Sequence, residues 1–138
     1  NATFINPLGL AFDEINNFLY IADNIRIRVR KIDLNSGIIS TIAGTGVQIY
    51  SGDDGPSINA SFVSVFGISL AFNNSVLFIT DPEANRIRML NLTSGIISLF
   101  AGNGIRGSNG DGGIATSASL SSPQYVILDS KEEFAYIS

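Results

Sequence analysis

The chain has 138 residues, of which 45% are hydrophobic and 14% charged, and its mean hydropathy is +0.29. This composition excludes intrinsic disorder, because enough apolar surface is available to form a buried core. Cysteine and histidine are both absent, which excludes disulfides, thiolate nucleophiles, imidazole bases and the zinc sites that need those ligands. The net charge of −4 opposes the phosphate backbone, so we do not expect a nucleic-acid partner.

No apolar stretch is long enough for a membrane span. The sequence contains no initiator methionine, signal peptide or transit segment. We therefore expect the chain to be a portion of a longer protein.

The sequence repeats itself with a period of 58 residues and without a gap. About 21 of the 58 positions are identical between the first two units, far more than chance gives in a fixed register. The longest shared run is Ser36 to Ser40, which returns as Ser94 to Ser98. The units are residues 2–59 and 60–117, and a partial third unit covers residues 118–138. This last unit stops inside a predicted strand, which also favours an incomplete chain.

Each unit predicts four short strands. The apolar runs are rich in Ile, Val, Leu, Phe and Tyr and are separated by turn residues, as strands are. In the first unit the predicted strands are residues 8–12, 18–22, 26–34 and 38–43. Four antiparallel strands that recur at a fixed period predict an all-β protein, a β-propeller of four-stranded antiparallel blades with about two and a third blades in this chain.

Two motifs of each unit resemble a known family. Pro7-x-Gly9-Leu10-Ala11-Phe12-Asp13, Leu19 to Asp23 and Arg28 to Ile32 are similar to the NHL-repeat β-propeller. The tail, Ile42 to Gly46 and then Gly52-Asp53-x-Gly55-Pro56, resembles the long, glycine-rich NHL variant of secreted or surface proteins. The Asn-His pair that names the repeat is missing, since Arg26-Ile27 and Ala84-Asn85 stand there. The resemblance implies a ring of usually six blades, completed by other parts of the protein or by neighbouring chains.

Arginines alternate with apolar residues in the third predicted strand and recur one unit later. Alternate side chains of a strand point to one face, so these arginines form a candidate interaction surface for an anion, a glycan or RNA. The alternative, which we favour, is structural: they pair with Asp23 and Asp81 or with turn carbonyls of adjacent blades. The arginines concerned are Arg26, Arg28, Arg30, Arg86 and Arg88.

Aspartates in the glycine-rich tails are weak candidates for calcium ligands, because carboxylates on a flexible backbone suit that ion. They are Asp53, Asp54 and Asp111. Their spacing does not match a helix–loop–helix calcium loop, and Asp and Gly are ordinary turn residues, so we expect neither a metal nor another cofactor.

Four Asn-x-Ser/Thr sequons, at Asn1, Asn59, Asn73 and Asn91, fall in predicted turns or inter-blade segments. A glycan on any of them would be solvated. We therefore expect N-linked glycans and an extracellular or cell-surface location.

No catalytic constellation is visible in this stretch, so we do not expect an enzyme. The function that we favour is a non-enzymatic structural module, or one that binds proteins or glycans. The length of the repeat does not vary, which favours an assembly in which each unit contacts equivalent neighbours, such as a self-assembling array or filament. One alternative is an enzyme or ligand-binding propeller, hydrolase-like or lyase-like, whose active residues lie in other blades. A second alternative is an RNA-binding NHL module.

Overall fold

The computed structural model describes residues 3–138 and is made of short antiparallel strands, which confirms the predicted all-β class. Single-turn 3-10 helices interrupt the connections at η1 (Ser57–Asn59), η2 (Pro82–Ala84) and η3 (Ala115–Ser117). Within the described residues, no helix has both the length and the apolar character needed to cross a membrane.

The first sheet has four strands in the order of the sequence. They are β1 (Pro7–Asp13), β2 (Phe18–Asp23), β3 (Arg28–Asp33) and β4 (Ile39–Ala43). Each pairs antiparallel with the next, as predicted. The third strand begins two residues later than expected, because Ile27 has a positive φ of 53° and belongs to the preceding turn.

The second sheet repeats this order and gains one strand from the first repeat. Its own strands are β6 (Ile68–Ala71), β7 (Val76–Asp81), β8 (Arg86–Asn91) and β9 (Ile96–Ala101). The added strand is β5 (Gly55–Pro56), which lies in the glycine-rich tail of the first repeat and pairs antiparallel with β9. The connection between the two sheets therefore covers the outer edge of the second one.

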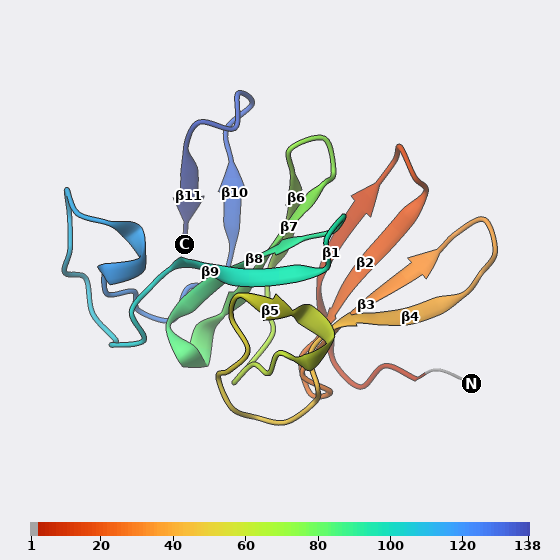
Figure 1. Ribbon diagram of the computed structural model, residues 1–138, viewed down its shortest axis with the longest axis horizontal. Coiled ribbons are helices and arrows are strands. Elements are labelled where there is room, and N and C mark those ends of the chain that lie inside the picture. Colours follow the sequence, from red (N-terminus) through yellow and green to blue (C-terminus); the bar gives the residue numbers. More distant parts are fainter. Residues whose placement is uncertain (1–2) are drawn as a thin grey trace.

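The third repeat contributes a hairpin of β10 (Val126–Leu128) and β11 (Ala135–Ile137). Figure 1 shows the three sheets side by side in sequence order. The first strands of successive sheets, β1, β6 and β10, are neighbours in space.

The cores lie between successive sheets. Tyr20 and Val29 of the first sheet pack with Leu77 and Ile97 of the second in one buried cluster. The next cluster joins Phe78, Ile87 and their neighbours in the second sheet to Val126 of the hairpin. A sheet of this protein is therefore stabilised by the sheet beside it, as in a stack of repeats.

Candidate functional site

Arg88 lies at the centre of the joint between the first two repeats. Its side chain is fully buried, and its Nη2 atom is 2.7 Å from Asp53 Oδ1. Nε donates to the same oxygen at 2.8 Å. Nη1 donates to the carbonyl of Ser61 at 2.8 Å, and Nη2 donates to the carbonyl of Ser51 at 3.0 Å. The guanidinium of the second sheet thus fixes the crossing loop of the first repeat.

Two aromatic rings enclose this guanidinium. The Arg88 Cζ atom is 5.1 Å from the Tyr50 ring centroid and 4.8 Å from that of Phe62. The Tyr50 hydroxyl donates a hydrogen bond to Asp53 Oδ2, and burial together with this carboxylate raises the pKa of Tyr50. Tyr50 could not be identified from the repeat, because Ser108 stands at the equivalent position one repeat later.

Arg28 and Arg86 have the same role in successive repeats. Nη2 of Arg28 donates to the carbonyl of Thr45, and Nη2 of Arg86 donates to the carbonyl of Asn103, both at 2.9 Å. These arginines hold loop carbonyls, as the structural alternative has it, but the loops belong to their own repeats and not to adjacent blades.

The prediction that these arginines form one accessible face is wrong. Arg26 is exposed in the turn before β3, outside the strand, because Ile27 breaks the extended backbone. Arg30 is half-buried and its Nε donates to the carbonyl of Ser40 at 3.4 Å. Since Arg88 is fully buried, it contributes nothing to an accessible surface.

The recurrent aspartates bind backbone amides, and the expected pairing with arginine is also wrong. Asp81 Oδ2 accepts the amide N–H of Val63 at 3.0 Å, and Oδ1 accepts the amide of Ser64 at 2.8 Å and its hydroxyl at 3.1 Å. Burial raises the pKa of Asp81. Asp23 accepts the equivalent amides in the first repeat. These carboxylates anchor the segment that enters each sheet.

Asp81→Asn is expected to lower the free energy of unfolding by about 2 kcal/mol, because an amide nitrogen cannot accept the N–H groups that the carboxylate satisfies. Urea denaturation followed by circular dichroism measures this loss. The matched control is Asp54→Asn at an exposed position, which should stay within about 0.5 kcal/mol of the parent protein. Equal losses in both variants would contradict the anchoring role.

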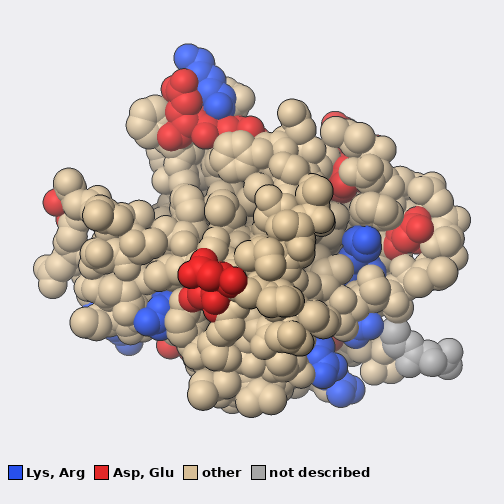
Figure 2. Space-filling view, in the orientation of Figure 1, with Lys and Arg blue, Asp and Glu red and all other residues tan. Residues whose placement is uncertain are grey.

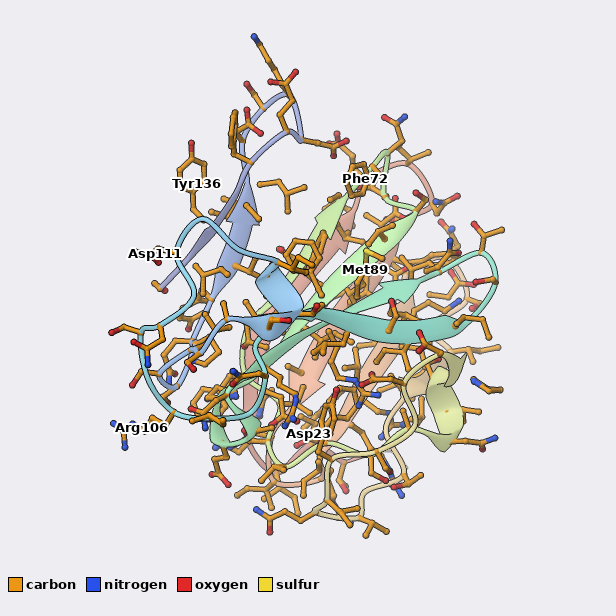
Figure 3. The ribbon with its side chains drawn as sticks, turned by 60° about the vertical axis from the view of Figure 1, so that its left-hand side comes forward. Asp23, Phe72, Met89, Arg106, Asp111 and Tyr136 are labelled. Atoms are coloured by element: carbon orange, nitrogen blue, oxygen red, sulfur yellow. The ribbon has the colours of Figure 1, made fainter. Side chains whose placement is uncertain are left out.

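The structure does not bring the three candidate calcium ligands together. The Asp53 carboxylate is occupied by Arg88 and Tyr50. Asp111 lies one repeat later in a separate exposed loop, as Figure 3 shows, while Asp54 is exposed beside β5. Residues 3–138 contain no group of three or more acidic, histidine or cysteine side chains placed to hold a metal ion.

Three of the four sequon asparagines, Asn59, Asn73 and Asn91, are exposed. The fourth, Asn1, lies outside the described residues. Charge on the visible face is dispersed, and Figure 2 shows most of that face uncharged, without a broad basic patch.

A groove of about 470 Å³ lies between the first two sheets. Tyr20 and Lys31 are directly opposite each other on β2 and β3 and line it. Only 3% of the Tyr20 surface is exposed, and its hydroxyl has no hydrogen-bond partner within residues 3–138. The Lys31 Nζ atom lies 4.3 Å from the centroid of the Phe18 ring. The role of these groove residues was not predicted. The sequence feature that could have indicated it is that they differ from the residues at the equivalent positions of the second repeat.

Burial, and secondarily the charge of Asp13, raise the pKa of Tyr20 to about 12. A tyrosine in the unfolded chain ionises near pH 10. The folded state therefore keeps its proton while the unfolded state loses it, so stability that is present below pH 10 falls between pH 10 and 12. We expect Tyr20→Phe to remove part of this fall, as measured by chemical denaturation at several pH values. An unchanged slope in the variant would contradict this assignment.

No protein-family model matches the chain. Among curated proteins, NHL repeat-containing protein 2 of Bos taurus is 30% identical over 101 residues, which cover 72% of this chain and 14% of that protein. Protein SUPPRESSOR OF QUENCHING 1, chloroplastic, of Arabidopsis thaliana is 30% identical over 133 residues, or 96% of this chain and 12% of that protein. The chain thus spans about one seventh of the length of the curated relatives it matches.

Solved structures share the fold. A structural genomics protein of unknown function from Bacteroides thetaiotaomicron superposes with a TM-score of 0.78 and 21% identity, over 95% of this chain and 32% of that one. A nidogen/laminin complex superposes with a TM-score of 0.63 and 19% identity, over 95% of this chain and 38% of that one. An auxiliary nutrient binding protein from Bacteroides thetaiotaomicron superposes with a TM-score of 0.72 and 20% identity, over 93% of this chain and 33% of that one. These neighbours are propeller proteins, and so the likeness identifies the sheets of this chain as propeller blades.

Proposed function

Since the chain is built of NHL-type β-propeller blades, we propose that it is a non-enzymatic extracellular module with a structural or interaction role. In this proposal its partner is a protein or a second copy of the chain, and it carries N-linked glycans. The observation that carries the proposal is an apolar face of the first sheet on which Leu10 is 63% and Phe12 54% exposed, with half-buried apolar side chains beside them.

This open face consists of Leu10, Phe12, Leu19, Ile32 and Ile39. One repeat later, the equivalent residues all contribute to the buried cluster between the first two sheets. The contrast is largest at one position: Leu10 is 63% exposed, whereas Ile68 is 7% exposed. The first sheet therefore covers the second, and its own open face has the chemistry of a blade-to-blade contact.

We infer that a further blade of the same repeat covers the open face. The contact that such a blade would make is already seen at the joint between the first two sheets. There, apolar side chains pack together and a loop aspartate pairs with a strand arginine. Large exposed apolar surfaces mark interaction sites in soluble proteins. Contact through equivalent blades also supports the self-assembling array that the unvarying repeat length suggests.

Light scattering of the purified chain over a range of concentrations tests the assembly. We expect the mass to rise with concentration, and Leu10→Glu to reduce that rise, because a buried unpaired charge is costly. Val47→Glu is the matched control, since Val47 in the crossing loop is exposed and its equivalent in the next repeat, Ile105, is exposed too. A monodisperse monomer at every concentration would overturn self-assembly.

Intact mass spectrometry before and after glycosidase treatment tests the extracellular part. Protein recovered from a secreting eukaryotic cell should lose mass on treatment if Asn59, Asn73 or Asn91 carries a glycan. A secreted chain with no loss of mass would count against the glycoprotein.

A further inference from the structure

Two residues that line the groove between the first two sheets differ in character from their equivalents in the second repeat. At the positions equivalent to Tyr20 and Lys31, the second repeat has Phe78 and Met89, which pack in the cluster between the second sheet and the hairpin. The Phe78 ring meets the Phe100 ring edge to face, with centroids 4.7 Å apart. Apolar side chains therefore stand in the second repeat at the positions where the groove has Tyr20 and Lys31.

Polar residues line this groove at positions where the second repeat has core residues. A third replacement follows the same rule, since Asp13 stands where the second repeat has Ala71. Although the Tyr20 side chain as a whole is almost completely buried, its hydroxyl is not among the buried atoms without a partner and faces the groove, where it makes no hydrogen bond within residues 3–138. The substitution of phenylalanine by tyrosine at a core position suits a ligand that accepts a hydrogen bond.

The groove holds one positive charge, on Lys31, and one negative charge, on Asp13. The Asp13 carboxylate is saturated, because it accepts two backbone amides of its own turn and the side-chain amides of Asn16 and Asn74. Lys31, in contrast, has no carboxylate within 4.0 Å among the described residues. Its ammonium is held over Phe18 and retains donors for an anion.

Ile42, Leu90 and Leu92 form the apolar part of the groove wall, and polar turn residues, among them Asn73 and Ser75, line the rest. A volume of about 470 Å³ falls in the range of small-molecule sites, which combine apolar walls with a few polar groups that fix orientation. We propose that this groove binds a small organic carboxylate, with its carboxylate between Lys31 and the Tyr20 hydroxyl and its apolar body against Leu90. The site is independent of the assembly proposed above, because it lies between sheets that are already joined.

Titration of the isotopically labelled chain with hexanoate, followed by NMR, tests this site. We expect shifts concentrated at Tyr20, Lys31 and Leu90. Lys31→Met should weaken hexanoate binding about tenfold or more, and Tyr20→Phe by about threefold to tenfold, since charge-assisted hydrogen bonds are the stronger ones. Both replacements are the residues that the second repeat carries at these positions, so the fold should tolerate them. Lys131→Met, in the exposed turn of the third repeat, is the matched control and should bind as the parent does.

Hexanol separates charge recognition from simple occupation of an apolar cavity. It should bind at least tenfold more weakly than hexanoate and should not distinguish Lys31→Met from the parent. Equal binding of hexanol and hexanoate, an undiminished affinity in Lys31→Met, or shifts that map outside the groove would each overturn the proposal, as would the absence of any hexanoate binding. Because the assembly is measured by light scattering, failure here would leave that result unaffected.

Discussion

Arg88→Ala is expected to lower the free energy of unfolding by about 3–5 kcal/mol, the usual cost of removing one partner of a buried ion pair. The substitution would leave the Asp53 carboxylate without its charged partner and would remove one of the two donors to each of the carbonyls of Ser51 and Ser61. It would also empty the space that Tyr50 and Phe62 enclose. Urea denaturation monitored by circular dichroism measures the loss.

Arg106→Ala serves as the matched control. Arg106 is exposed and its side chain makes one hydrogen bond, to the hydroxyl of Ser121, so its loss should cost about 0.5 kcal/mol or less. Arg88→Lys should be intermediate between Arg88→Ala and the parent, because lysine keeps the charge without the planar fork of donors. If Arg88→Ala and Arg106→Ala cost the same, the guanidinium would not hold the joint.

Gly102→Ala is expected to destabilise the chain by about 2–4 kcal/mol. Its φ of 92° disfavours any side chain, and a Cβ atom there would lie 2.2 Å from the carbonyl oxygen of Asn85 and 3.0 Å from Arg86 Cα. Because both neighbours are backbone atoms, the second sheet would have to move to admit the methyl group.

Gly95→Ala separates backbone strain from steric overlap. Gly95 also has a positive φ, 72°, but nothing lies within 4 Å of a Cβ atom built there. We expect a cost of about 1 kcal/mol from conformation alone. Thermal and urea unfolding of both variants should show the larger loss for Gly102→Ala, and equal losses would contradict the close approach.

The strands could be predicted because the same pattern of apolar runs and turn residues occurs in both repeats. Short apolar runs between turn residues gave β1, β2 and β4 to within a residue or two, and the recurrence of Leu19 as Leu77 fixed the register. The start of β3 was missed because the alternation of arginine with apolar residues continues through Ile27, whose positive φ the sequence pattern does not reveal.

The joint between the first two repeats was harder to predict. Arg88 and Asp53 are 35 residues apart in sequence and come from different repeats, so only the crossing of the glycine-rich tail to the next sheet brings them together. Tyr20 and Lys31 were hidden for the opposite reason. The prediction relied on positions that are alike in the two repeats, whereas Tyr20 and Lys31 differ from their equivalents. Such a difference can be interpreted only once the groove between the sheets is known.

Native-state amide hydrogen exchange tests most directly whether the loop of one repeat is fixed to the next sheet. The amides of Asp54 and Ser57 donate to the carbonyls of Ile97 and Gly95 at 2.7 and 2.8 Å, so both should be protected as strongly as the strands of the second sheet. The equivalent amides of Gly112 and Ala115 have no acceptor within residues 3–138 and should exchange rapidly. Equal exchange at the two pairs of amides would contradict a loop that joins successive blades.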